Sequence, residues 1–265
     1  MDNITEKEEI FHDDWANAIN VDDVLVDEFF EACTAPENRI ILRKLQEFNN
    51  KKILELGCGA GEASVYFAKK GADVVASDIS GGMLNLAQKL ASNHNVKIET
   101  KKFSTTNIDF PDNTFDIVYA ANLLHHVDIK PTIAEVNRVL KKNGIFVSYD
   151  PVQYNPIINI YRKMANEVRT SNEHPILRQD VRLMKKTFSK VECYFTWFTT
   201  LLIFIKFYLI DRIHPNQERY WKKIIIEHKK LEPLYNKLDT IDKILIRLFP
   251  FLKWYCWNIV IIAVK

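Results

Sequence analysis

The sequence predicts an α/β fold with a doubly wound, mostly parallel β-sheet, and three observations lead to this class. Strand-like and helix-like segments alternate between residues 50 and 150, a rhythm typical of parallel strands joined by right-handed crossovers. One apolar strand, residues 52–56, runs directly into closely spaced glycines and then into a helical pattern. The chain has 265 residues, of which 47% are hydrophobic, so it can bury a large core. We therefore expect one α/β domain with additions.

The first 45 residues are predicted to form helices that lie outside the sheet. One helix is expected over residues 21–33, where apolar side chains recur on one face and acidic side chains lie elsewhere. A second helix is expected over residues 36–48, because it would begin with a proline, which is favoured at the first helical position.

The central part of the chain is predicted to form five strands and three helices of the sheet. Short apolar runs bounded by polar or glycine residues indicate the strands, and apolar residues at helical spacing indicate the helices. The predicted strands are residues 52–56, 73–77, 96–100, 115–120 and 144–149, and the predicted helices are residues 62–69, 82–92 and 130–140.

The part of the chain after Asp150 is predicted to complete the sheet and to add helices to it. The predicted helices are residues 155–170, 178–186, 216–230 and 233–248, and the predicted sixth and seventh strands are residues 191–198 and 256–264.

A very apolar stretch joins the sixth strand to the helices that follow. Between Cys193 and Ile210 the one charged residue is Lys206, which brings the stretch to the threshold of a membrane-spanning segment. A true span is disfavoured, since it would separate the sixth and seventh strands of one sheet. We interpret the stretch as a buried strand followed by a packed helix, and the alternative is a surface that contacts a membrane peripherally.

Charge and cysteine content narrow the class of protein further. The net charge is +2, which does not indicate a nucleic-acid-binding protein. The four cysteines show no CxxC spacing, so we expect reduced thiols and a cytoplasmic location, with membrane association as the alternative. Acidic residues follow Met1, and no signal peptide is predicted.

The glycine loop after the first strand has an informative spacing. Gly57, Gly59 and Gly61 alternate with other residues, whereas the dinucleotide-binding fingerprint G-x-G-x-x-G would require a glycine at position 62. That position holds Glu62, and a further acid, Glu55, lies near the end of the strand. The loop therefore indicates a nucleotide-like ligand and argues against a nicotinamide dinucleotide.

From Ile53 to Gly61 the chain resembles motif I of the class I S-adenosylmethionine-dependent methyltransferases, of the small-molecule type 11 kind. Further segments resemble the same family in the same order: residues 74–80, 110–118, 122–127 and 135–144. The resemblance covers about residues 50–150. It implies a seven-stranded sheet whose last strand is antiparallel and lies between strands five and six. The expected organisation is an N-terminal helical lid (1–45) followed by a cofactor-binding core (46–150). Residues 151–265 are expected to add strands six and seven to the same domain, with helical insertions after strand five and between strands six and seven.

The resemblance also implies S-adenosylmethionine as the cofactor and assigns residues to it. The strand-end acid and the glycine loop would approach the methionine part, and Asp78 would accept both ribose hydroxyls. The loop after strand three carries hydroxyls where the family often has an aspartate, and Asn107 or Asp109 are alternatives for the adenine contact. The residues expected to bind the cofactor are Glu55, Gly57, Cys58, Gly59, Gly61, Asp78, Ile79, Met83, Ser104, Thr105, Asn122 and Leu123.

The acceptor side is expected to carry histidines. His125 or His126 would serve as a general base near neutral pH. Adjacent histidines on a turn should point in different directions, so we expect at most one of them to be catalytic. Without a third ligand they predict no metal site. His12 or Trp15, in a segment that resembles the family's aromatic lid, would close over the sulfonium.

The segment after strand five is expected to build the pocket for the acceptor. Polar and aromatic residues gather there, and the candidates are Tyr154, Tyr161, Arg162 and Arg169. The two arginines are seven residues apart on one helix face and could hold a carboxylate or phosphate, or could form structural ion pairs.

The sequence thus predicts a methyltransferase acting on oxygen or nitrogen of a small, hydrophobic or lipid-like acceptor. Two alternatives are a nicotinamide-dependent oxidoreductase and a cofactor-binding scaffold without catalysis. No nucleic-acid partner is predicted, and the oligomeric state is left open.

Overall fold

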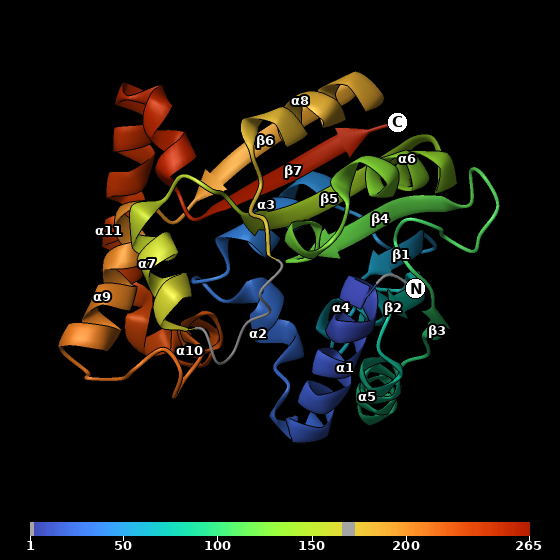
Figure 1. Cartoon of the computed structure of the whole chain (residues 1–265), viewed down its shortest axis with the longest axis horizontal. Helices are drawn as coiled ribbons and strands as arrows, with labels where there is room; N and C mark the ends of the chain where they lie inside the picture. Colours follow the sequence, from blue (N-terminus) through green and yellow to red (C-terminus); the bar gives the residue numbers. More distant parts are fainter. Residues whose placement is uncertain (1–2, 166–172) are drawn as a thin grey trace.

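The computed structural model describes residues 3–165 and 173–265 and shows the predicted α/β architecture. A seven-stranded sheet has the order β3-β2-β1-β4-β5-β7-β6 (Figure 1). β7 pairs antiparallel with both β5 and β6, and the other neighbouring strands are parallel. The strands are β1 Lys52–Leu56, β2 Asp73–Asp78, β3 Glu99–Lys102, β4 Phe115–Ala121, β5 Leu140–Pro151, β6 Lys190–Thr196 and β7 Asn258–Val264.

Helices cover both faces of the sheet and extend beyond one end of it (Figure 1). The α-helices are α1 Asn3–Ala18, α2 Val26–Glu31, α3 Pro36–Leu45, α4 Glu62–Lys69, α5 Gly81–Asn93, α6 Ile129–Val139, α7 Pro156–Met164, α8 Arg178–Thr187, α9 Leu202–Leu209, α10 Tyr220–Ile226 and α11 His228–Leu248. Short 3-10 helices are η1 Val21–Asp23, η2 Leu124–His126, η4 Thr199–Leu201 and η5 Pro250–Tyr255.

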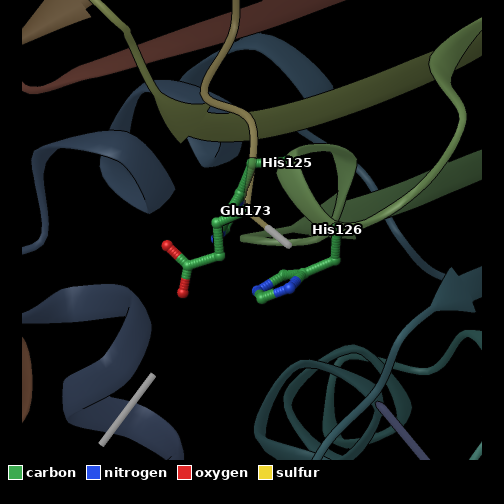
Figure 2. Close-up of side chains that lie close together, drawn as sticks. All are labelled: His125, His126 and Glu173. Carbon is green, nitrogen blue, oxygen red and sulfur yellow. The ribbon is translucent and has the colours of Figure 1, made fainter. Parts of the chain in front are cut away.

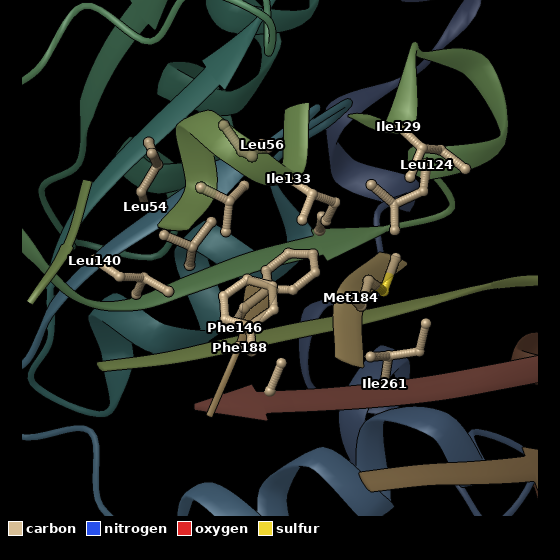
Figure 3. Packing of buried hydrophobic residues seen from close by; sticks show 14 of the residues in the cluster. Leu54, Leu56, Leu124, Ile129, Ile133, Leu140, Phe146, Met184, Phe188 and Ile261 are labelled. Atoms are coloured by element: carbon tan, nitrogen blue, oxygen red, sulfur yellow. The ribbon is translucent and has the colours of Figure 1, made fainter. Parts of the chain in front are cut away.

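Two hydrophobic clusters hold the sheet between its helices. Successive strand residues point to opposite faces, so Leu54 and Leu56 join the cluster under α6 and α8, whereas Ile53 joins the cluster under α2, α3 and α4. Figure 3 shows the first of these clusters, in which Phe146 and Phe188 pack with parallel rings. Both faces are buried, as parallel sheets require.

Two helix predictions differ from the structure. The single helix predicted over 21–33 is wrong, because the chain makes the turn η1, extends, and then forms α2. β-branched valines at positions 21, 24 and 26 lower the helix propensity there. The break predicted between residues 230 and 233 lies instead at Glu227, and α11 continues through Pro233, which lies near its start.

The apolar stretch after β6 folds into η4 and α9, which pack inward. Ile203, Phe204 and Phe207 are buried in a third cluster with α7, α10 and α11. The end of α9 is different, since Leu209 is 65% and Ile210 71% exposed. Among the described residues no helix combines the length and the apolar character needed to cross a membrane.

The N-terminal helix α1 is anchored to the turn that follows β2. Asp13 Oδ1 accepts hydrogen bonds from the Gly82 backbone N–H at 2.9 Å and from the Ser80 hydroxyl at 2.5 Å. The Ser80 hydrogen bond, more than any other contact, holds the pKa of Asp13 below its ordinary value. These contacts place α1 beside the carboxyl ends of the central strands.

Candidate active site

A cavity of about 1000 Å³ lies where the carboxyl ends of β1, β2, β4 and β5 meet. Ligands of doubly wound folds bind at this edge of the sheet, and the volume is at the upper end of the range for small-molecule sites. One part of the lining comes from the loops after β1, β2 and β3. The other part comes from α1, η2, the segment 173–174 and the helices inserted between β6 and β7.

The three glycines of the loop have left-handed backbone conformations that favour glycine, but they have different roles. Gly57, Gly59 and Gly61 have φ angles of +65°, +52° and +91°. A Cβ atom at Gly59 would meet nothing within 4 Å, so this residue borders open space in the cavity lining. A Cβ at Gly61 would lie 2.7 Å from the Ala87 Cβ. Gly61 therefore lets α4 approach α5 and does not line the cavity.

We expect Gly61→Ala to lower the free energy of unfolding by about 3 kcal/mol, because it combines left-handed backbone strain with a clash against α5. Gly59→Ala carries the strain alone and should lose about 1 to 2 kcal/mol. Urea unfolding of both variants measures the difference. Equal losses would contradict the distinct roles of the two glycines.

Asp78 links the loops that follow β1 and β2. Its Oδ2 accepts the Gly59 backbone N–H at 3.0 Å, and its Oδ1 accepts the Ser80 N–H at 2.9 Å. The residue is 8% exposed, and burial raises its pKa. Ile79 follows it in the lining of the cavity. The carboxylate therefore lies at the cavity wall with a fixed orientation.

Two further carboxyls are buried around the same loop. Glu55 Oε2 accepts the Ser64 hydroxyl hydrogen at 2.5 Å, and burial raises the pKa of Glu55 to about 8. Burial also raises the pKa of Glu62, the first residue of α4. Both residues line the cavity with Asp78. This concentration of carboxyls is suited to a cationic ligand.

Loops after β3 and β4 complete this part of the wall. Ser104 and Thr105 line the cavity, and the Thr105 hydroxyl is 2.9 Å from that of Thr132. Asn122, with a φ of +51°, donates its backbone N–H to the Tyr149 carbonyl at 2.8 Å. Asn122 and the adjacent Leu123 line the cavity, as does Cys58 from the glycine loop.

Several predicted site residues lie elsewhere. Met83 is fully buried in a cluster with Ala16, Ala60 and Leu86 and is not itself among the lining residues. The helix α7, expected to help build the acceptor pocket, packs on the insertion through Ile158 and Tyr161. Arg169 lies outside the described residues. Three predicted acceptor residues are absent from the described lining: Tyr154, Tyr161 and Arg162. The Tyr154 ring contacts Trp254, and the Tyr161 ring contacts Phe204 and Tyr220. The Arg162 guanidinium pairs with Glu173 at 2.7 Å.

The histidines predicted for the acceptor side converge on one space. The rings of His125 and His126 are 4.1 Å apart between centroids, and His12 is 6.3 Å from His126. The turn η2 therefore brings the adjacent rings together rather than apart. Figure 2 shows them with Glu173, which comes from a distant segment of the chain. All four residues line the cavity.

His125 has a fixed orientation. Its Nδ1 is 2.8 Å from Asp150 Oδ1, and its backbone N–H donates to the same oxygen at 3.3 Å. Asp150, the last residue but one of β5, is 1% exposed, and burial raises its pKa well above the ordinary value. Because Nδ1 faces Asp150, Nε2 is the atom of this ring that can reach a ligand.

Sequence reasoning did not identify several cavity residues. Glu37 on α3 accepts hydrogen bonds from Thr196 and from Asn258, the latter at 2.9 Å. These partners are 159 and 221 residues away, so no local pattern could have revealed them. The missed residues also include Glu8, Asn38, Trp197, Trp221 and Trp257.

The insertion closes the cavity with apolar and aromatic groups. Trp197, Trp221 and Trp257 line it together with Ile224 and Ile225. The Arg219 guanidinium lies 3.9 Å from the ring centroid of Trp15, and this contact links the insertion to α1.

Comparisons with known proteins match the central part of this chain to methyltransferases. Residues 54–148 match a family model described as a methyltransferase domain. Phosphoethanolamine N-methyltransferase 3 from Arabidopsis thaliana is 33% identical over 84 residues, which are 31% of this chain and 17% of that protein. Demethylmenaquinone methyltransferase from Paenarthrobacter aurescens is 30% identical over 146 residues, 55% of each chain. The chain thus spans about half or less of the length of these curated relatives.

A solved structure shares the fold over most of this chain. It is phosphoethanolamine N-methyltransferase 2 from Haemonchus contortus, in complex with phosphomonomethylethanolamine and S-adenosylhomocysteine. The TM-score is 0.56 at 18% identity, and the match covers 87% of this chain and 52% of that one. At this identity the likeness concerns the fold.

Proposed function

We infer that the chain transfers a methyl group from S-adenosylmethionine to a small acceptor, because residues 54–148 match a family model described as a methyltransferase domain. The donor carries its methyl on a sulfonium that is already activated for in-line displacement. The protein then has mainly to orient donor and acceptor and to exclude water, which is catalysis by proximity and orientation. A single cavity of about 1000 Å³ offers room for both molecules.

The group of buried carboxyls at the glycine loop carries this proposal. A methyl donor with a sulfonium and an ammonium group brings positive charge, which Glu55, Glu62 and Asp78 would stabilise. A nicotinamide dinucleotide would instead place its pyrophosphate at the start of α4, where Glu62 lies. The acidic wall therefore favours the methyl donor over the dinucleotide.

The residues of this wall have distinct proposed roles. Asp78 would accept the ribose hydroxyls, Glu55 would hold the ammonium group, and Gly59 would let the ligand approach the backbone. Ile79, Ser104 and Thr105, which line the cavity, would hold the adenine ring, and Cys58, Asn122 and Leu123 complete the wall.

The acceptor is proposed to be hydrophobic, with an oxygen or nitrogen nucleophile. The three tryptophans Trp197, Trp221 and Trp257 offer an apolar wall, as drug-sized apolar ligands require. His126 or His125 would take up the acceptor proton, and Trp15 and His12 on α1 would cover the reacting groups.

Binding of S-adenosylhomocysteine tests the donor assignment. We expect saturable binding of S-adenosylhomocysteine in a calorimetric titration, and no measurable binding of NAD or NADH under the same conditions. Binding of NAD without binding of S-adenosylhomocysteine would overturn the proposal in favour of an oxidoreductase.

The hydrophobic acceptor can be tested separately. The protein would be incubated with S-adenosylmethionine labelled on the methyl group and with either a lipid extract or a water-soluble extract of cells. We expect the label to enter the organic phase in the lipid reaction, and not with heat-inactivated protein. Label confined to water-soluble products would reject the hydrophobic acceptor but leave methyl transfer intact.

A further inference from the structure

Two imidazoles and a carboxylate converge in the cavity in a way that methyl transfer from a sulfonium does not require. One potential ligand atom from each of His125, His126 and Glu173 lies within 4.8 Å of the other two (Figure 2). Adjacent ligand atoms of an ion with bonds of about 2.1 Å are about 3.0 Å apart in octahedral geometry and about 3.4 Å apart in tetrahedral geometry. Small side-chain rotations would therefore bring the three atoms into coordination distance.

The surroundings of His125 resemble those of metal-binding histidines. The carboxylate of Asp150 contacts Nδ1 at 2.8 Å, which orients the ring and directs Nε2 toward a ligand. Metal-binding histidines regularly donate their second ring nitrogen to a carboxylate in this manner. Asp150 is 1% exposed, so this arrangement is built into the interior.

The backbone holds Glu173 opposite the histidine turn. The His174 backbone N–H donates to the His125 carbonyl at 2.8 Å, and His174 Nε2 is 2.9 Å from the Val127 carbonyl oxygen. Arg162 donates to Glu173 Oε2 at 2.7 Å. A carboxylate has enough lone pairs to accept this hydrogen bond and also to coordinate an ion. The position of Glu173, the third ligand, is therefore fixed by contacts within the fold.

We propose that His125, His126 and Glu173 bind a first-row divalent metal ion, represented by Zn²⁺, beside the bound methyl donor. Two histidines and one glutamate form the ligand set of catalytic zinc sites and of facial-triad sites with open positions. Mg²⁺ and Ca²⁺ prefer oxygen ligands and suit this set less well. Glu8, whose Oε2 is 3.6 Å from His126 Nδ1, adds negative charge next to the site.

The role of the ion rests on the proposed function, although the binding itself does not. In a methyltransferase, a divalent ion at this position would replace the two histidines as the group that activates the acceptor. It would bind the acceptor through the open coordination positions and favour the deprotonated form of a hydroxyl, whose proton would pass to water. An acceptor oxygen flanked by a second oxygen would then be preferred over an amine. The site thus narrows the acceptor class to hydroxylated compounds that can coordinate a metal.

Metal binding is to be measured on the full chain without methyl donor or acceptor. Protein treated with a chelator would be titrated with Zn²⁺ against a chromophoric competitor, and Co²⁺ would be added separately to record its visible absorption. We expect one equivalent of Zn²⁺ to bind with micromolar or tighter affinity, and a Co²⁺ spectrum typical of nitrogen and oxygen ligands. Failure to bind one equivalent of either ion would overturn the proposal.

Variants locate the site and separate ligands from the residue that orients them. Glu173→Gln and His126→Gln should each weaken Zn²⁺ binding by more than about 100-fold, whereas Asp150→Asn, which acts through His125, should weaken it by about 10- to 100-fold. His94→Ala, at the end of α5, is the matched control and should bind as the unaltered protein does. Undiminished binding in both ligand variants would overturn the site.

The same variants are titrated with S-adenosylhomocysteine to distinguish the two proposals. Retained binding of S-adenosylhomocysteine in Glu173→Gln shows that the variant is folded, so its loss of Zn²⁺ binding counts for the metal site. If the unaltered protein binds Zn²⁺ but not S-adenosylhomocysteine, the metal site stands and the proposed methyl transfer fails.

Discussion

Replacement of Asp78 by alanine is expected to lower the affinity for S-adenosylhomocysteine by about 100- to 1000-fold. The carboxylate is nearly buried at the cavity wall, and its two oxygens are already oriented by the Gly59 and Ser80 N–H groups. Two ribose hydroxyls donating to it would each form a charged hydrogen bond worth about 1.5 to 3 kcal/mol. The variant also loses the link between the two loops, which adds to the effect.

Calorimetric titration measures this loss, and Asp73→Ala provides the matched control. Asp73 begins the same strand at its opposite, exposed end, so its removal should change the affinity less than about 2-fold. The fold of Asp78→Ala is checked by its thermal unfolding in the absence of ligand. If a folded Asp78→Ala protein binds S-adenosylhomocysteine within 3-fold of the unaltered protein, Asp78 does not hold the ribose.

Replacement of Glu55 by glutamine is expected to change the pH dependence of stability by as much as about 5 kcal/mol. Burial raises the pKa of Glu55 to about 8, whereas the unfolded chain has the ordinary value of about 4.3. The native state thus binds the proton more tightly than the unfolded state. The stability that this group contributes is fully present below about pH 4 and is lost as the pH rises toward 8.

Glutamine cannot ionise, so Glu55→Gln should gain stability relative to the unaltered protein as the pH rises from about 5 to about 9. Urea unfolding across this range measures the difference between the two proteins. Glu47→Gln, an exposed substitution beyond α3, is the control and should show a flat difference. A flat difference for Glu55→Gln as well would show that Glu55 is ionised in the folded protein.

The same carboxyl gives a second readout during ligand binding. An ammonium group beside Glu55 favours its ionised form, so S-adenosylhomocysteine binding near pH 7 should release a proton. Titrations in two buffers with different ionisation enthalpies detect this release. The Glu55→Gln variant should bind S-adenosylhomocysteine more weakly and release fewer protons on binding. An unchanged proton release would show that the proton comes from another group.

The cofactor side of the site could be predicted from the sequence because its determinants are local. The strand β1, the glycine turn and the start of α4 are contiguous, and hydrophobic period and glycine spacing report directly on such a unit. Asp78 likewise ends a strand, β2, that the local hydrophobic pattern predicts. Two residues expected to bind the cofactor have packing roles instead. Gly61 allows α4 to approach α5, and Met83 is part of the hydrophobic core.

The acceptor side was predicted less well because long-range packing decides it. Tyr161 and Arg162 are on the expected helix, but the insertion between β6 and β7 covers that helix and turns its apolar face into core. Three tryptophans line the cavity in their place: Trp197 after β6, Trp221 in α10 and Trp257 before β7. These three residues share no local sequence pattern.

The sequence by itself determined the α/β class, the strand sequence, the glycine loop and the carboxyls that favour a cationic methyl donor, because strand, turn and helix signals act over a few residues. Only the tertiary structure decided that His125, His126 and Glu173 meet, and that Asp150 orients the first of them. His125 and Glu173, 48 positions apart, are brought together by one backbone hydrogen bond, from His174 N–H to the His125 carbonyl, and by the contact of the His174 ring with the Val127 carbonyl. Contacts between two loops far apart in the sequence set this arrangement, and no local pattern encodes it.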